Sequence, residues 1–308
     1  MSGTKQLTAG TRSSQMALVQ TDRVIEKLVE TYPGLKVTKS IITTRGDIDH
    51  APIPLDSIGK EWFTKEIEQA LLDRQIDFAV HSLKDLPPEQ PAGLTILPIL
   101  QRDNPRDGLV ANFKTSLAEL PQGAVIGTDS LRRKALVLKL RPDLNIKSIR
   151  GNANTRIQKL KSGDFDALIM AVAGLQRINR TDILFEQFDP STFIPSIGQG
   201  ALAVEVLTER KDLINMFLRL QDKSTIKAVE AERLLAKVLG GGCKLPIGCY
   251  VHFEKKIVSI HGMVGSMDSM HCVTKTLRGA AIDTDKLIRQ LAAELAKEPF
   301  VANYVKIR

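Results

Sequence analysis

The sequence predicts an α/β protein made of two hinged, doubly wound α/β domains and a small α+β C-terminal domain with an antiparallel sheet. The length of 308 residues is enough for two or three domains of about 100–150 residues each. Through residues 7–206, short apolar runs alternate with segments whose apolar residues recur at helical spacing, the pattern of parallel sheets covered by helices. After residue 249, apolar and polar residues alternate in short segments, as in antiparallel strands.

The first predicted domain is discontinuous and comprises residues 1–100 and 201–219. Ser13 or Ser14 can cap its first helix, because a hydroxyl at this position accepts a hydrogen bond from a free backbone N–H. Pro33 and Gly34 end that helix, since proline cannot continue it. The other predicted elements are strands at 7–9, 37–44 and 76–80 and a helix at 61–73.

The second predicted domain, residues 101–200, repeats this alternation after a polar segment at 101–107 that we interpret as a hinge. Its first helix can be capped by the residues at 128–130, and it ends near Pro142. We expect strands at 124–127, 146–149 and 167–173 and helices at 131–140 and 155–161. Residues 197–200 form the predicted return crossing, and a strand at 201–206 rejoins the first domain.

The third predicted domain, residues 220–308, begins with a helical pattern that ends at the glycines of 240–242. Three alternating segments follow, and a helix ends the pattern. We expect strands at 249–253, 257–264 and 272–277 and a helix at 285–297.

The composition makes several classes of protein less favoured, although the net charge alone decides nothing. The net charge is +8, but only 5% of the residues are aromatic, whereas nucleic-acid surfaces usually combine basic runs with interleaved aromatic residues. No run of about 18 apolar residues exists, so we expect no membrane span. Three cysteines and a short polar N-terminal segment favour a reducing compartment, and we expect a cytoplasmic protein. The five histidines lack metal-ligand spacing, so we expect no metal site.

Arginines occupy corresponding places in the two predicted α/β domains. Ligands of open α/β sheets bind beyond the carboxyl ends of the strands, where helix N-termini attract anions. An arginine in the first turn of a helix opposes the helix dipole, and a bound anion would offset that unfavourable interaction. We therefore expect a ligand with several carboxylates or phosphates, bound between these domains by Arg12, Arg45, Lys84, Arg132, Arg133, Arg150, Arg156 and Arg177.

Two further residues carry candidate chemistry. Asp85 follows Lys84 in the turn after the predicted strand at 76–80, and neighbouring cations would keep its carboxylate ionised. It could then stabilise a cationic intermediate or move a proton between nitrogens, or it could simply cap the turn before Pro87. Cys243 follows three glycines and precedes Lys244, a setting that favours the thiolate. A small apolar residue in an ordinary turn is the alternative interpretation of this cysteine.

A match to a known family runs from Thr11 to about Gly248, about four-fifths of the chain. Six motifs carry it: His81–Asp85, Gly127–Arg133, Arg150–Asn152 with Thr155 and Arg156, Ala171–Leu175, Gly198–Ala201, and Gly241–Cys243 with Pro246–Gly248. In residue type, order and spacing they resemble the hydroxymethylbilane synthase family, also called porphobilinogen deaminase. Together these motifs are highly specific.

The resemblance implies a transferase that joins four porphobilinogen molecules head to tail and releases ammonia at each step. Water then frees linear hydroxymethylbilane, a tetrapyrrole precursor of haem. The resemblance also implies a dipyrromethane cofactor, made from the substrate and held by a thioether to Cys243. Asp85 matches the catalytic carboxylate, which assists ammonia loss and stabilises the cationic azafulvene.

The resemblance further assigns contacts to the acetate and propionate groups of cofactor and substrate, because every pyrrole carries two carboxylates. The implied cofactor contacts are Lys84, Ser130, Arg132, Arg133 and Arg156. The implied substrate contacts are Arg12, Ser14, Arg150, Arg177 and Gln199. A mobile loop over the cleft matches Lys60, Trp62 and Phe63, but Glu61 and Trp62 replace the small residue and leucine that are common in the family.

Two other functions are compatible with parts of this pattern. A non-catalytic two-domain binding protein for small anions, of the periplasmic type, would explain the arginines and the hinges but not Cys243 beside its glycines. A nucleic-acid binder would explain only the net charge. We therefore favour the enzyme, and we expect a monomer with neither nucleic-acid nor membrane partners.

Overall fold

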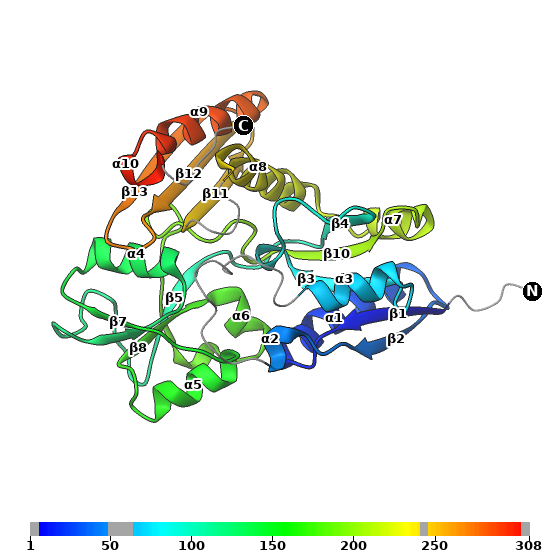
Figure 1. Ribbon diagram of the computed structural model, residues 1–308, viewed down its shortest axis with the longest axis horizontal. Helices are drawn as coiled ribbons and strands as arrows, with labels where there is room; N and C mark the ends of the chain where they lie inside the picture. Colours follow the sequence, from blue (N-terminus) through cyan, green and yellow to red (C-terminus); the bar gives the residue numbers. More distant parts are fainter. Residues whose placement is uncertain (1–5, 49–63, 241–245, 303–308) are drawn as a thin grey trace, which may run out of the picture. The chain divides into compact units, whose positions relative to one another are not determined.

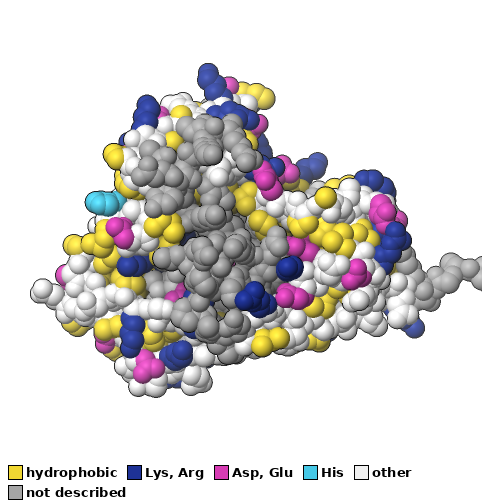
Figure 2. Space-filling view, in the orientation of Figure 1, with side chains coloured by type: hydrophobic (Ala, Val, Ile, Leu, Met, Phe, Trp, Pro, Cys, Tyr) yellow, Lys and Arg dark blue, Asp and Glu magenta, His cyan; other side chains and the backbone are white. Residues whose placement is uncertain are grey.

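The computed structural model describes residues 6–48, 64–240 and 246–302 (Figure 1). The chain forms two compact units, unit 1 with residues 1–103 and 201–226, and unit 2 with residues 104–200 and 227–308. The division into three domains, with limits at 100, 200 and 219, remains a prediction. Figure 2 shows basic side chains interspersed with acidic and apolar ones on the face in view. Within the described ranges, no helix is long and apolar enough to cross a membrane.

Unit 1 is built on a five-stranded sheet with the strand order β2-β1-β3-β10-β4. β1 pairs in parallel with β2 and β3, whereas β10 runs antiparallel to β3 and β4. The strands are β1 (Gln6–Thr11), β2 (Lys36–Ile41), β3 (Phe78–Ser82), β4 (Leu94–Ile99) and β10 (Leu202–Leu207). The predicted strand at 201–206 therefore does rejoin the first sheet, and it is the reversed strand there.

Helices cover both faces of this sheet. Leu28 of α1 and Phe217 of α7 pack with Phe78 of β3 in one apolar cluster, and Leu71 of α3 packs with Ala79 in another. Phe78 and Ala79 are consecutive, and consecutive strand residues point to opposite faces of a sheet. Helices α1 and α7 therefore cover one face of the sheet, and α3 covers the other. The helices are α1 (Gln15–Thr31), α2 (Arg45–Ile48), α3 (Lys65–Leu72) and α7 (Lys211–Leu218).

Unit 2 contains a second five-stranded sheet, with the order β7-β6-β8-β5-β9. β6 pairs in parallel with β7 and β8, and β5 runs antiparallel to β8 and β9. The strands are β5 (Asp107–Ala111), β6 (Val125–Gly127), β7 (Asn145–Lys147), β8 (Ala167–Ala171) and β9 (Leu184–Gln187). The helices are α4 (Leu131–Leu140), α5 (Ala153–Lys161) and α6 (Val172–Arg177).

The second sheet differs from the sequence prediction at β5. We expected residues 101–107 to cross between domains, but Asp107 is completely buried and begins a strand that ends at Ala111. A charged first residue hid this strand, because the hydrophobic pattern starts only after it. The half-buried edge strand β9, with four residues, was not predicted either. The strand expected at 167–173 ends at Ala171, and the unpredicted helix α6 begins at Val172. In unit 1, the eight-residue helix α7 was not predicted.

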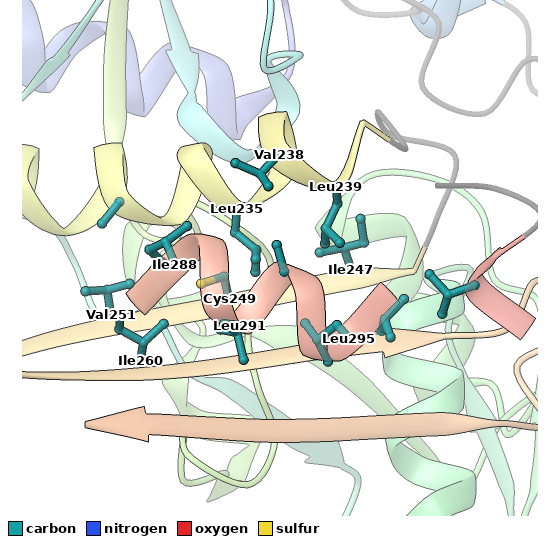
Figure 3. Close-up of a cluster of buried hydrophobic side chains, with 14 of the residues drawn as sticks. Leu235, Val238, Leu239, Ile247, Cys249, Val251, Ile260, Ile288, Leu291 and Leu295 are labelled. Atoms are coloured by element: carbon teal, nitrogen blue, oxygen red, sulfur yellow. The ribbon is translucent and has the colours of Figure 1, made fainter. Parts of the chain in front are cut away.

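A third sheet, antiparallel with the order β11-β12-β13, follows in unit 2. Figure 3 shows Leu235 of α8, Cys249 of β11 and Leu291 of α9 packing together in its core, where Cys249 is completely buried. The elements are α8 (Lys223–Leu239), β11 (Ile247–Glu254), β12 (Ile257–Gly265), β13 (Cys272–Ala280), α9 (Thr284–Ala296) and α10 (Pro299–Ala302). Two α/β sheets and one antiparallel sheet confirm the predicted fold class.

Candidate active site

The candidate catalytic residue Asp85 lies on a short turn at the end of β3. The strand passes into a 3₁₀ turn, Leu83–Asp85, in which the Leu83 N–H donates to the carbonyl oxygen of Ala201 at 3.0 Å. Leu83 and Leu86 are buried, whereas Asp85 is exposed and Lys84 is half-buried. The two leucines therefore hold the turn in place while the carboxylate of Asp85 stays accessible to a ligand.

Two polar contacts support the end of β3. His81 Nε2 lies 3.0 Å from Glu205 Oε2 of β10, and both side chains are buried. Gln20 Nε2 of α1 donates to Ser82 Oγ at 2.8 Å. These contacts join β3 to a neighbouring strand and to the covering helix just before the turn that presents the candidate carboxylate of Asp85.

Arg12 and Ser14 follow β1, which pairs in parallel with β3, so they lie at the same sheet edge as that turn. Ser14 Oγ accepts the N–H of Ala17 at 3.3 Å and caps α1. Arg12 Nε donates to both carboxylate oxygens of Asp47, each at 3.1 Å. Burial raises the pKa of Asp47, but hydrogen bonds from Arg12 and Thr44 outweigh burial and hold the pKa below its ordinary value.

Arg132 and Arg133 converge on one buried carboxylate, that of Asp107. Arg132 Nη2 donates to Asp107 Oδ2 at 2.7 Å, and Arg133 donates to Oδ1 through Nε at 3.1 Å and Nη2 at 2.8 Å. Gln199 Nε2 donates to the same Oδ1 at 3.0 Å. All four side chains are buried. The arginines that begin α4 predicted a bound anion, and one such anion is the carboxylate of Asp107 in the protein itself.

Burial and charge shift the pKa values in this group. Burial raises the pKa of Asp107, but the positive charges of Arg132 and Arg133 outweigh burial and hold the pKa far below its ordinary value. Burial lowers the pKa of Arg132, and the attraction of Asp107 offsets this only in part. Because two buried guanidinium groups face one carboxylate, the group carries a net positive charge.

Two more arginines extend this positive region. Arg156 Nε of α5 donates to the carbonyl oxygen of Gly151 at 2.9 Å, and Arg150 Nε lies 2.8 Å from Asp129 Oδ2. Burial lowers the pKa of Arg156, and the neighbouring charges of Arg133 and Arg150 lower it further, against the attraction of Asp129. We define the arginine cluster as Arg132, Arg133, Arg150 and Arg156 with Asp107 and Asp129, a set with two more positive than negative charges.

The segment 195–200 brings Arg177 and Gln199 to the same part of unit 2. Arg177 Nη2, at the end of α6, donates to the carbonyl oxygen of Gly200 at 2.7 Å. Gly198 and Gly200 have φ values of +70° and +89°, which favour glycine. Gln199 Nε2 donates to the carbonyl oxygen of Pro105 at 2.8 Å as well as to Asp107, so its amide hydrogens are directed at protein oxygens.

The structure places the predicted residues in two groups. Unit 1 has Arg12, Ser14, Lys84 and Asp85 at one sheet edge, and unit 2 has Ser130, Arg132, Arg133, Arg150, Arg156, Arg177 and Gln199. Cys243, Lys60, Trp62 and Phe63 lie outside the described residues. Within the described part of the chain, no group of three or more His, Cys, Asp or Glu side chains is arranged to hold a metal ion.

The carboxylate partners of these arginines were not predicted from the sequence: Asp47, Asp107 and Asp129. The sequence offers one signal for Asp107, a charged residue directly before a run of apolar residues. If that run is a buried strand, the charge needs a partner. No local signal identified which arginines would supply it, since they follow Asp107 by about 25 positions.

Comparison with known proteins identifies the family. The model described as "Porphobilinogen deaminase, dipyromethane cofactor binding domain" matches residues 7–215, and "Porphobilinogen deaminase, C-terminal domain" matches residues 226–297. A curated relative named porphobilinogen deaminase, from Syntrophobacter fumaroxidans, is 41% identical over 287 residues, which are 93% of each chain. Another of that name, from a Roseiflexus species, is 42% identical over 290 residues, covering 94% of this chain and 95% of its own.

Among solved structures, a probable amino-acid ABC transporter extracellular-binding protein from Bacillus subtilis has a TM-score of 0.42 and 14% identity, covering 71% of this chain and 90% of its own. The family assignment depends on the sequence matches, which extend over both units and nearly the full length of the relatives. The chain belongs to the porphobilinogen deaminase family.

Proposed function

We propose that this protein is a hydroxymethylbilane synthase, a transferase of tetrapyrrole and haem biosynthesis. It joins four porphobilinogen molecules head to tail, releases ammonia at each step, and hydrolyses the product to linear hydroxymethylbilane. The observation that carries this proposal is the family match over residues 7–215, the part of the chain that includes Asp85 and the arginine cluster.

The chemistry of the arginine cluster fits the dipyrromethane cofactor that the family model names. Each pyrrole carries an acetate and a propionate group, so two pyrroles present four carboxylates. The cluster has four guanidinium groups but only two carboxylates, and Arg132 and Arg133 are buried where charge is poorly solvated. Carboxylates of the cofactor would compensate the remaining positive charge, with bidentate hydrogen bonds from guanidinium groups.

The residues that the family resemblance assigns would hold the cofactor and the substrate. We propose Lys84, Ser130, Arg132, Arg133 and Arg156 as cofactor contacts, with the Cys243 thiol as the covalent anchor. We propose Arg12, Ser14, Arg150, Arg177 and Gln199 as substrate contacts, and Lys60, Trp62 and Phe63 as part of a covering loop. When bound, the cofactor supplies the pyrrole end from which the product chain grows.

Asp85 is proposed to act on the reacting pyrrole. Its carboxylate is exposed on a turn that the buried Leu83 and Leu86 hold in place, so it can approach a ligand without rearrangement of β3. A carboxylate beside a pyrrole nitrogen stabilises the positive charge that develops as ammonia leaves. It can also accept and return the proton on that nitrogen. Lys84, on the same turn, would attract the carboxylates of the cofactor.

The proposal extends to the surroundings in which the protein works. We propose a cytoplasmic protein, because the chain has only three cysteines, an odd number that suits a reducing compartment better than a disulfide framework. We propose a monomer that binds no nucleic acid; against nucleic-acid binding, only 5% of the residues are aromatic, whereas nucleic-acid surfaces usually combine basic runs with aromatic residues. Size-exclusion chromatography with light scattering tests the monomer, and salt-dependent retention on DNA tests the absence of nucleic-acid binding.

The assay for this function is incubation with porphobilinogen, followed by measurement of released ammonia and linear tetrapyrrole. We expect four ammonia molecules per tetrapyrrole. Asp85→Asn keeps the size of the side chain and removes its charge, so turnover should fall by about 10²–10⁴-fold. Because Asp85 is exposed, the melting temperature should stay near that of the unmodified protein.

The matched control is Asp73→Asn, which changes an exposed aspartate at the end of α3 in the same unit. It should turn over porphobilinogen at the unmodified rate. An unmodified protein that binds porphobilinogen without releasing ammonia would instead support a binding protein, and normal turnover by Asp85→Asn would remove Asp85 from the proposed role.

A further inference from the structure

The guanidinium groups of Arg132 and Arg133 are held by Asp107 and by backbone oxygens of other elements. Asp107 is the first residue of β5, and its carboxylate accepts hydrogen bonds from Arg132 and Arg133 of α4 and from Gln199. Each arginine has a second attachment to a backbone oxygen. Arg132 Nη1 donates to Ile194 at 2.6 Å, and Arg133 Nη1 donates to Ile169 at 3.0 Å. Two separate attachments fix both the position and the plane of each guanidinium group.

Stability alone does not explain this arrangement. A buried ion network contributes little compared with apolar side chains of the same volume, because its charges must be removed from water. Here the network also lacks charge balance, since Asp107 faces both Arg132 and Arg133 while the half-buried Arg156 adds further repulsion. Such an arrangement is favourable when another anion completes it.

We propose that Asp107 is a positioning residue for the cofactor: it holds Arg132 and Arg133 in the orientation that receives the cofactor's carboxylates. The proposal rests on the proposed function, from which it takes the cofactor. Asp107 acts through the arginines and touches neither the cofactor nor the substrate. A substitution of Asp107 should therefore weaken the uptake of the cofactor, a step that precedes any turnover.

Two other roles for Asp107 predict different results. If its carboxylate merely competes with the cofactor for the arginines, its removal should strengthen cofactor binding. If it only stabilises the fold, a variant that is still folded should take up the cofactor normally. If it positions the arginines, uptake should weaken even in the folded variant, because a displacement of about 1 Å can reduce the efficiency of a preorganised site by about a hundredfold.

The test follows cofactor uptake by mass rather than by activity. Full-length protein and Asp107→Asn are produced in cells that make no porphobilinogen and are then incubated with it over a range of concentrations. Mass spectrometry of the denatured chains gives the loaded fraction, and circular dichroism establishes a temperature at which both proteins are folded. We expect the porphobilinogen concentration for half-maximal loading to rise by about 10–100-fold in Asp107→Asn.

The control variant is Asp143→Asn, which alters another aspartate–arginine pair of unit 2. Asp143 accepts from Arg141 Nε at 2.8 Å and from Nη2 at 2.6 Å, but this pair is partly exposed and belongs to no site described above. It should load like the unmodified protein. Equal or stronger loading of folded Asp107→Asn would overturn the proposal.

Asp107→Glu decides the question if the asparagine variant does not fold. It keeps the negative charge between Arg132 and Arg133 but displaces the carboxylate by one methylene group. We expect a folded protein with weakened loading, and loading at the unmodified level would overturn positioning. An unmodified protein that gains no mass would refute the proposed function itself, whereas normal loading by both Asp107 variants would refute this inference alone.

Discussion

Asp85 and Asp107 are both aspartates near cations, yet their surroundings suit them to different tasks. Asp85 is exposed on a turn beside Lys84, so its oxygens can interact with a ligand. Asp107 is completely buried, and its two oxygens accept hydrogen bonds from two arginines and a glutamine. A carboxylate with so many hydrogen-bond donors is held rigidly, and its oxygens already accept hydrogen bonds from the protein. Its burial and its hydrogen bonds therefore favour a supporting role for Asp107, whereas the exposed Asp85 is the better candidate for contact with the reacting pyrrole.

The lowered pKa of Asp107 predicts how stability depends on pH. In the unfolded chain its pKa lies near the ordinary 3.8, and in the folded protein it lies far below that value. The unfolded state therefore binds the proton first, so the stabilisation is present above about pH 3.8 and is lost as the pH falls toward the folded pKa. Below this pH, the free energy of unfolding should fall more steeply for the unmodified protein than for Asp107→Asn, by up to about 1.4 kcal/mol per pH unit.

Urea unfolding of both proteins at a series of pH values from about 3 to 5 measures this difference. Comparing slopes rather than absolute stabilities removes the constant effect of the substitution. Parallel slopes for the two proteins would contradict a strongly lowered pKa at Asp107.

At the scale of elements, three helices begin in the same way beside predicted site residues. Ser14 caps α1, Ser130 caps α4 and Asn152 caps α5, each by accepting a backbone N–H through its side chain. None of these helices has an acidic residue in its first turn, where aspartate and glutamate are usually stabilising. Neutral caps leave the positive ends of the helices available to an anionic ligand, which agrees with the positive charge of the arginine cluster.

The start of α5 gives a prediction about backbone conformation. Gly151 has a φ of +107°, and a Cβ there would lie 2.6 Å from Thr155 Cγ2 and 2.7 Å from its Cβ. Gly151→Ala should therefore destabilise the protein by about 2–3 kcal/mol. Because the carbonyl oxygen of Gly151 accepts from Arg156 Nε, the shifted turn should also slow cofactor loading.

Gly163→Ala is the matched control at the other end of α5. Its φ of +84° is also unfavourable for alanine, but no atom lies within 4 Å of the added Cβ. We expect a loss of about 1–2 kcal/mol and normal loading. Thermal unfolding and mass spectrometry of both variants make the comparison, and equal effects on loading would contradict the role of this turn.

At the scale of the whole molecule, the sequence predicted best what local patterns determine. Apolar periodicity identified most strands and helices of both α/β sheets, and the return of β10 to the first sheet was correct. β5 was missed because Asp107 conceals its start, and β9 because a short, half-buried edge strand has little hydrophobic pattern. The arginines were found because they recur at strand ends, but their partners were not, since only the folded chain brings Asp107 to Arg132 and Arg133.

We propose above all that this chain builds its own dipyrromethane cofactor on Cys243 and elongates it. The most direct test is the mass of the denatured protein after incubation with porphobilinogen, followed by peptide mapping, with Cys243→Ser as the control. We expect an added mass equal to two deaminated porphobilinogen units, or to an elongated chain, on the peptide that contains Cys243. Cys243→Ser should keep the mass of its sequence. An unmodified protein that gains no mass, or that gains it at another residue, would contradict the account.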